Sequence, residues 1–235
     1  MYPSIESTVG EIISTPWNIT NGIKVPETED VVLKNGGKLV DATYLYADLA
    51  GSSKLAQSLT KEATAKIIKV YINTASRILK NYGGEIRSFD GDRVMAIFMG
   101  SSKNWNAVRA ALGIQWAVMK VIRPAIESGW SDGANFCDID HAVGIDTGEA
   151  LIVRGGVRDN NDLVSVGGAP NVAAKLSDLR NLNSVFISDR VHDTLSDDLL
   201  TYDDGRRKIW SRMPSSVQIG GSHTTVYGSS VHWGV

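Results

Sequence analysis

Cysteine is almost absent from this chain of 235 residues, because Cys137 is the only one. A lone cysteine excludes an intrachain disulfide framework and supplies no zinc-ligand or dithiol pattern. No apolar stretch approaches the ~20 residues that span a bilayer. Residues 1–20 lack the basic segment and apolar core of a signal peptide. We therefore expect a soluble, cytoplasmic protein with no membrane partner.

An excess of either charge is also missing. The chain carries 24 Lys and Arg against 26 Asp and Glu. It therefore lacks the excess of positive charge that is typical of nucleic-acid-binding proteins, and we expect no nucleic-acid partner. Hydrophobic residues make up 43% of the chain, which is enough for a real core. We expect an N-terminal extension over residues 1–38, with Pro3, Pro16 and Pro26, and one domain over residues 39–235.

The patterning of the chain predicts alternating strands and helices. Strand-forming residues at 42–49 precede a helix at 60–82, whose apolar residues recur every three or four positions. Asp90-Gly91 between strands 85–89 and 93–98 is a hairpin signal. Further elements are expected in this order: a helix from about residue 104 that Pro124 ends or kinks, a strand at 139–145 with a partner strand at 149–154, a strand at 163–166, a helix from Pro170 to about Arg180, a strand at 185–188, a short helix from Asp189 and two weak C-terminal strands. This order predicts an α+β fold of the split βαβ, ferredoxin-like type, with an antiparallel-containing sheet and flanking helices.

Two aspartates stand where such a sheet exposes side chains. Asp48 ends the first strand, just before a glycine-containing turn, and Asp92 lies at the tip of the hairpin. Neighbouring strands can bring both carboxylates to one edge, where they suit Mg²⁺ or Mn²⁺. Taken alone, either aspartate is better explained as a turn residue or a solvated charge.

Four segments give these aspartates a context. Residues 46–52 (Tyr-Ala-Asp-Leu-Ala-Gly-Ser), residues 83–98 with Phe-Asp-Gly-Asp, residues 143–150 (Val-Gly-Ile-Asp-Thr-Gly-Glu-Ala) and residues 166–176 resemble, in family order, the motifs of class III adenylate and guanylate cyclases. One such motif would be a weak signal, and four in order are a strong one. The resemblance covers about residues 40–190.

The resemblance implies a site shared between two subunits of a head-to-tail homodimer. One subunit would hold two Mn²⁺ or Mg²⁺ ions at Asp48, Leu49 and Asp92, and the other would contribute Asn171 to the ribose and Lys175 to the phosphates. The family usually has arginine at position 175, and lysine keeps the charge but loses the planar fork. The turn with Ser52 and Ser53 is expected to bind the triphosphate through backbone N–H groups.

The base-recognition positions depart from the purine cyclases. Two positions that usually read a purine are Ser88 and Val164, and Val164 offers no hydrogen bond. Tyr46 and Arg93 are bulky where purine cyclases have smaller residues. Together these features resemble the pyrimidine cyclases of the bacterial Pycsar antiphage system, which make cyclic UMP or cyclic CMP as a signal for an effector protein. Strand alternation alone would point Arg93 away from Asp92.

We therefore predict a lyase that converts UTP, and possibly CTP, to the 3′,5′-cyclic monophosphate and pyrophosphate by a two-metal mechanism. Two alternatives stay open from the sequence. One is a bacterial adenylate cyclase that makes cyclic AMP. The other is a catalytically inactive cyclase-like module that dimerises or binds a nucleotide for regulation.

Overall fold

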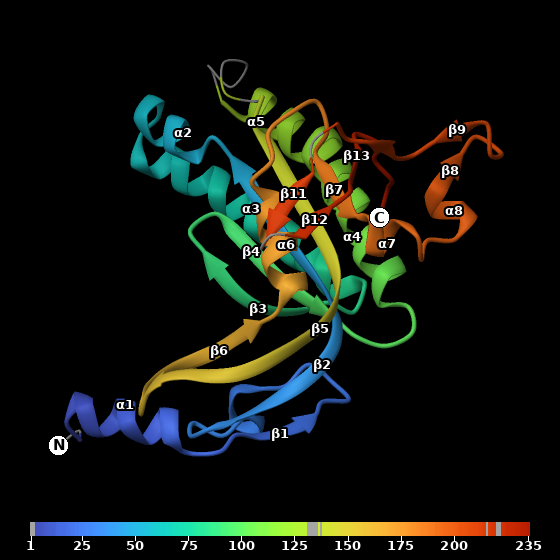
Figure 1. Cartoon of the computed structure of the whole chain (residues 1–235). Coiled ribbons are helices and arrows are strands. Elements are labelled where there is room, and N and C mark those ends of the chain that lie inside the picture. The colour runs from blue at the N-terminus through green and yellow to red at the C-terminus, as the bar shows by residue number, and fades with distance from the viewer. Residues whose placement is uncertain (1–2, 131–135, 137, 215, 220–221) are drawn as a thin grey trace.

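A computed structural model describes residues 3–130, 136, 138–214, 216–219 and 222–235. Cys137 lies outside these residues. Figure 1 shows a body, in which helices cover the sheet, and an arm that extends from it and ends near the N-terminus. The helical segments are α1 (Ile5–Ser14), a 3₁₀ turn (Thr28–Asp30), α2 (Ser52–Ser58), α3 (Lys61–Asn81), α4 (Lys103–Ala117), a π-helical segment (Val118–Ile122), α5 (Arg123–Gly129), α6 (Gly168–Ser177), α7 (Asp189–His192) and α8 (Asp197–Leu200). The strands are β1 (Asn18–Asn21), β2 (Gly36–Ala50), β3 (Glu85–Asp90), β4 (Arg93–Phe98), β5 (Asp140–Val157), β6 (Asn160–Val166), β7 (Val185–Ser188), β8 (Thr201–Tyr202), β9 (Arg207–Lys208), β10 (Ser211–Arg212), β11 (Val217–Ile219), β12 (Ser222–Thr224) and β13 (Val226–Ser229).

The main sheet is built around β2. Its strands run in the order β10-β13-β7-β5-β2-β4-β3, with β1 beside β2 and β6 beside β5. β2 pairs with β5 in antiparallel register from Gly37 to Ala50. On its other edge β2 pairs first with β1, in parallel, and then with β4, in antiparallel register. The predicted α+β class with a largely antiparallel sheet is confirmed.

Both faces of the sheet are covered in the body. Leu45, Ala47 and Leu49 of β2 pack among the apolar residues of α3 and α4. The alternate residues Tyr44 and Tyr46 belong to the opposite cluster, which includes alanines of α6. This division follows from the two-residue period of a strand. It places Asp48, two positions beyond Tyr46, on the α6 face.

The predicted helix at 60–82 forms as α3, with the Thr60 hydroxyl accepting a hydrogen bond from the Ala63 N–H. This N-cap satisfies one of the free donors of the first turn. After α3 the chain turns through Gly83, at φ +76°. The predicted hairpin around Asp90-Gly91 also forms, and Gly91 takes φ +62° at its tip.

One prediction for this sheet was wrong. Residues 139–145 and 149–154 are not partner strands, because residues 140–145 and 149–154 both belong to the single long strand β5. Gly148 lies within β5 at φ +152° and opposes Ala42 of β2, so the glycine does not produce a turn. The partners of this strand are β2, β6 and β7.

Smaller differences concern the helices and the C-terminal region. Helical structure does not end at Pro124: α4 is followed by a π-helical segment, and α5 continues through the proline to Gly129. Such a segment accommodates the missing N–H of proline. α6 ends at Ser177 rather than near Arg180. Two C-terminal strands were expected, whereas the described residues form six short ones, β8–β13.

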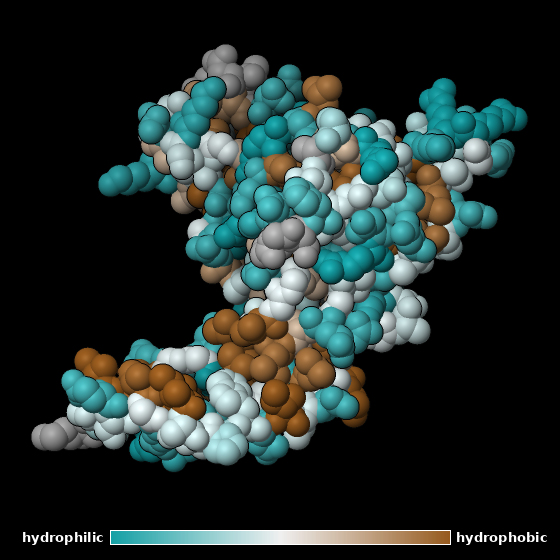
Figure 2. All heavy atoms as spheres, viewed as in Figure 1, coloured by the Kyte–Doolittle hydropathy of each residue, from teal (hydrophilic) through white to brown (hydrophobic). Residues whose placement is uncertain are grey.

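The arm consists of residues 3–35 together with the first residues of β2 and the hairpin of β5 and β6. Figure 2 shows brown, apolar patches over α1 and near the hairpin. Exposed apolar side chains of the arm are Ile5, Val9, Ile12, Ile13, Trp17, Ile19, Ile23, Val32, Leu33, Val157, Val164 and Val166. Among the described residues no helix combines the length and apolar character needed to cross a membrane.

Candidate active site

Asp48 lies near the end of β2, beside the first residue of β4. Its register partner across the β2–β4 pair is Arg93, so both side chains project from the same face of the sheet. The Asp48 side chain is 15% exposed. Burial raises the pKa of this carboxyl above its usual value, the hydrogen bond from Arg180 opposes that rise, and the negative charge of Asp92 adds to it.

Asp92 follows Gly91 in the tight turn between β3 and β4. Its Oδ2 atom is buried and has no hydrogen-bond partner in the described part of the chain. A buried carboxylate oxygen without a partner is costly. A divalent cation shared with Asp48 would supply that partner, so these residues fit the metal site that the sequence predicts.

The protein alone offers a small ligand set at this edge. Within the described ranges no cluster of three or more His, Cys, Asp or Glu side chains is placed to hold a metal. Mg²⁺-type ions in nucleotide enzymes are often bound by one or two carboxylates and the substrate phosphates. Leu49 packs its side chain in the core, so only its backbone carbonyl could contribute to such a site.

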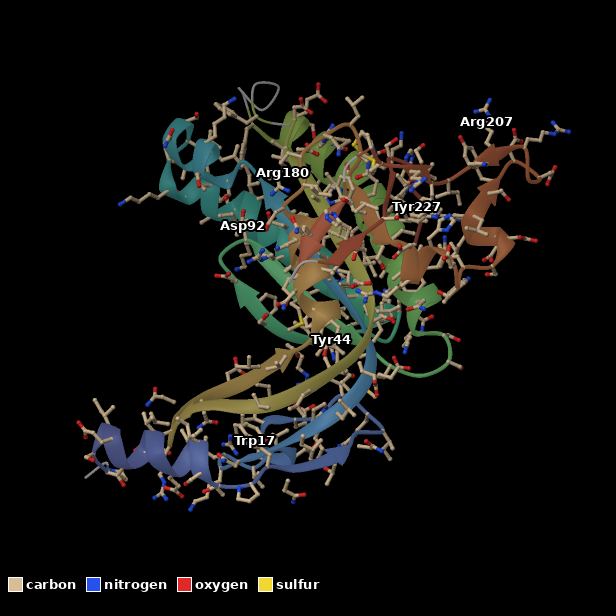
Figure 3. The ribbon with its side chains drawn as sticks, in the orientation of Figure 1. Trp17, Tyr44, Asp92, Arg180, Arg207 and Tyr227 are labelled. Carbon is tan, nitrogen blue, oxygen red and sulfur yellow. The ribbon has the colours of Figure 1, made fainter. Side chains whose placement is uncertain are left out.

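Arg180 is the nearest cation to Asp48. Its Nη2 donates to Asp48 Oδ2 at 2.6 Å. Its Nη1 donates to the carbonyl oxygens of Ser177 at 2.7 Å and Leu179 at 2.9 Å. Figure 3 labels Arg180 and Asp92 at the same edge of the sheet. Arg180, held at the end of α6, therefore places a positive charge next to Asp48, the carboxylate predicted to bind metal.

Tyr46 and Arg93 meet beside these carboxylates. The guanidinium carbon of Arg93 lies 5.6 Å from the centroid of the Tyr46 ring, within the range of a cation–π contact. Arg93 Nη2 also donates to Asp90 and Nη1 to Asp178, each at 3.3 Å. Both acidic partners are largely exposed, so these ion pairs are weak and can exchange for a ligand.

Ser52 and Ser53 form the first turn of α2, directly after Gly51 at φ +75°. Lys54 and Leu55 donate their backbone N–H groups to the Gly51 carbonyl. The N–H groups of Ser52 and Ser53 are the ones that a first helical turn leaves without an intrahelical acceptor.

Asn171 and Lys175 lie one turn apart on the exposed side of α6. Lys175 Nζ donates to the backbone carbonyl of Gln218 at 2.9 Å. No hydrogen bond or ion pair links either residue to Asp48 or Asp92 within the described part of the chain. One chain therefore brings the two aspartates together with Tyr46 and Arg93, but does not bring Asn171 and Lys175 to them.

Sequence reasoning did not identify Asp178 and Arg180 as site residues. Asp178 stands three positions after Lys175, which places it near that residue on a helix surface, so helical spacing could have suggested it. Arg180 follows the helix, and its contact with Asp48 spans 132 positions of sequence. No local pattern points to such a contact.

Comparison with known proteins places this site in a family. The sequence profile described as "Adenylate and Guanylate cyclase catalytic domain" matches residues 37–225. A uridylate cyclase of Rhodovulum sp. (strain MB263) is 44% identical over 210 residues, with 88% of each chain covered. A uridylate cyclase of Burkholderia cepacia is 41% identical over 197 residues, which cover 83% of this chain and 84% of the relative.

Solved structures agree on the fold. The adenylyl cyclase CyaB from P. aeruginosa superposes with a TM-score of 0.69 at 21% identity, over 82% of this chain and 95% of that chain. The guanylyl cyclase Cya2 gives a TM-score of 0.66 at 20% identity, with 82% and 93% covered. The family match, the 44% identical relative and the shared fold together show that the chain belongs to the class III nucleotide cyclases, the family of adenylate and guanylate cyclase catalytic domains.

Proposed function

We propose that this protein is a pyrimidine nucleotide cyclase that converts UTP, and more slowly CTP, to the 3′,5′-cyclic monophosphate and pyrophosphate. The observation that carries the proposal is the Tyr46–Arg93 pair, held beside Asp48 and Asp92 on one face of the sheet. Relatives at 44% and 41% identity are named uridylate cyclases, which supports the same substrate class.

Class III cyclases act on nucleoside triphosphates with divalent metals. We propose that Asp48 and Asp92, with the Leu49 carbonyl, hold two such ions, Mn²⁺ or Mg²⁺. Bound there, the ions would lower the pKa of the ribose 3′-hydroxyl and neutralise charge on the triphosphate. The N–H groups of Ser52 and Ser53 would donate to phosphate oxygens next to this site.

We propose that a second copy of the chain completes the site. Asn171 of one subunit would orient the ribose, and Lys175 would neutralise charge on the phosphates as the 3′-oxygen attacks the α-phosphorus in line. Two observations support this arrangement: in the described part of the chain Asn171 and Lys175 are exposed and make no hydrogen bond to their own Asp48, and the arm carries exposed apolar side chains. Exposed apolar patches of this kind often mark interfaces.

The base would be recognised by size and by polar contacts. A pyrimidine ring is smaller than a purine, so the Tyr46 ring and the Arg93 guanidinium can fill part of a pocket that a purine would need. Arg93 has donors for the pyrimidine O2. A site built on such donors disfavours ligands that leave them unpaired.

The resemblance to the Pycsar pyrimidine cyclases supports a role for the product in antiphage defence. The cyclic nucleotide would act as a second messenger in antiphage defence and reach an effector protein in the cytoplasm. Residues 1–38 would form an extension outside the catalytic domain of residues 39–235. Loss of protection in cells that carry the Asp92→Ala variant, with the effector present, would test the defence role.

The direct test of the proposed activity is product identification. Purified protein is incubated separately with ATP, GTP, CTP and UTP in Mn²⁺, and the products are identified by mass spectrometry. Cyclic UMP as the main product supports the proposal. Cyclic AMP as the main product would favour an adenylate cyclase, and no product from any triphosphate would favour an inactive regulatory module.

A further inference from the structure

The Arg180 guanidinium is held from two sides. Nη1 donates to the carbonyl oxygens of Ser177 and Leu179 at the end of α6, and Nη2 donates to Asp48 at 2.6 Å. The carbonyl contacts place the positive charge where the dipole of α6 is negative. They also fix the guanidinium plane next to Asp48 independently of the bond to Asp48 itself.

Asp48 needs a cation, and Arg180 supplies it in the metal-free protein. The Asp48 side chain is 15% exposed, whereas the Arg180 side chain is 40% exposed. The carboxylate is therefore on the protein side of the pair and the guanidinium on the solvent side, from which a metal or a substrate arrives. Asp92, whose buried Oδ2 has no hydrogen-bond partner among the described residues, adds further negative charge to the same edge.

We infer that Arg180 couples metal binding to triphosphate binding. The inference rests on the proposed metal site at Asp48 and Asp92. A metal ion that binds alone at Asp48 must displace the Nη2 hydrogen bond and then lies next to a fixed positive charge. This repulsion weakens metal binding in the absence of nucleotide.

A bound triphosphate reverses this effect. The freed Nη2 turns its donor to a phosphate oxygen of the substrate, while Nη1 stays on the α6 carbonyls. The guanidinium fork suits phosphate oxygens and stays charged at any physiological pH. Arg180 would thus favour the metal–nucleotide complex over the metal alone, and the ligand class is the polyphosphate of a nucleoside triphosphate or of pyrophosphate.

The experiment measures two affinities in each variant. Mn²⁺ binding to the nucleotide-free protein is followed by electron paramagnetic resonance of the free ion. Binding of 2′,3′-dideoxy-UTP, which lacks the attacking hydroxyl, is followed by calorimetry at saturating Mn²⁺. The variants are Arg180→Gln, Arg180→Lys, Asp48→Asn and, as a matched control, Arg207→Gln on exposed β9.

We expect opposite changes in Arg180→Gln: Mn²⁺ alone binds about 3- to 10-fold more tightly, and the dideoxynucleotide binds about 10-fold more weakly. These factors are in the usual range of coupling between sites. Arg180→Lys keeps the positive charge but lacks the planar guanidinium, so we expect both affinities to change in the same directions as in Arg180→Gln but by less. Arg207→Gln should change neither affinity, and thermal melts confirm that each variant is folded.

If Arg180 only caps α6, its replacement should change the two affinities in the same direction or leave both unchanged. Either result overturns the inference. If Asp48→Asn abolishes a Mn²⁺ site that Arg180→Gln leaves unchanged, the metal site stands and the coupling role of Arg180 fails. If the parent protein has no Mn²⁺ site that depends on Asp48, the proposed metal site fails and the inference with it.

Discussion

The Arg93 guanidinium lies 5.6 Å from the Tyr46 ring centroid, and Arg93 is the register partner of Asp48 on the adjacent strand. Sequence alternation alone would have turned Arg93 away from Asp92. The β2–β4 register explains how Arg93 still reaches the site: Asp92 belongs to the turn, and the strand residue on the same face as Arg93 is Asp48. The proposed base contact therefore lies next to the proposed metal site.

Replacement of Arg93 tests its role in base recognition. Arg93→Ala should lower kcat/KM for UTP by about 100-fold or more, because a donor to the base is lost and the pocket is enlarged. Mn²⁺ affinity should stay within about 3-fold of the parent. Steady-state kinetics with UTP and ATP measure the effect, with Arg158→Ala in the exposed β5–β6 turn as the control. An equal loss for UTP and ATP would contradict a role in base selection.

Subunit complementation tests the shared site. Asp92→Ala and Asn171→Ala should each be inactive, because the first lacks a metal carboxylate and the second the residue proposed for the ribose. Mixed and allowed to exchange subunits, they should regain up to about a quarter of parental turnover, since half of the subunits would pair as heterodimers with one intact site each. Exchange is verified by light scattering and by a tagged subunit. No recovery despite exchange would count against the shared site.

Gly144 positions α6 on the sheet. A Cβ at Gly144 would lie 2.2 Å from the carbonyl oxygen of Ala173 and 2.4 Å from the Ser177 nitrogen, both backbone atoms of α6. Gly144→Ala should therefore lower the free energy of unfolding by about 2–4 kcal/mol through overpacking. Gly168→Ala is the matched control, because no atom of the described residues lies within 4 Å of its added Cβ. Denaturant titration measures the free energy of unfolding of both variants. Equal values would contradict a close contact between α6 and Gly144 of β5.

His141 should make stability depend on pH. The ring is buried, and Nε2 lies 2.5 Å from Gln115 Oε1. Burial, together with the positive charges of Arg123 and Arg180, lowers the pKa of His141 from 6.5 to about 3. Below pH 6.5 His141 therefore binds a proton in the unfolded state but not in the folded state. The free energy of unfolding thus falls as the pH drops from 6.5 toward 3.

The slope from His141 alone approaches about 1.4 kcal/mol per pH unit. Urea titrations between pH 7 and pH 5 should reveal it, since most carboxyl groups titrate lower. His141→Gln should flatten the curve in this interval, and the exposed His232→Gln should leave it unchanged. Identical curves for the parent and His141→Gln would contradict this assignment.

Local patterns predicted most of the elements that hold the site. Thr60 caps α3, Asp90-Gly91 forms the hairpin, and β2 alternates between two clusters as its sequence suggests. Each of these features depends on residues close together in the chain. The fold class and the proximity of Asp48 to the β3–β4 turn follow from them.

The features that sequence did not predict depend on distant contacts. Residues 139–145 and 149–154 were predicted to be two partner strands, but β2 pairs with β5 on both sides of Gly148, and this pairing keeps the strand continuous. The contact of Arg180 with Asp48 depends on how α6 packs against Gly144, which no short segment encodes. The parallel pairing of β1 with β2 likewise depends on the course of the whole arm.

Competition between triphosphates tests the central claim most directly. Equimolar UTP and ATP are mixed with the purified protein and Mn²⁺, and the ratio of cyclic UMP to cyclic AMP at low conversion gives the ratio of the two kcat/KM values. The Asp92→Ala variant controls for a contaminating cyclase. The proposal predicts at least about 100-fold more cyclic UMP, a discrimination within reach of polar contacts to the base. A product mixture in which cyclic AMP equals or exceeds cyclic UMP would contradict it.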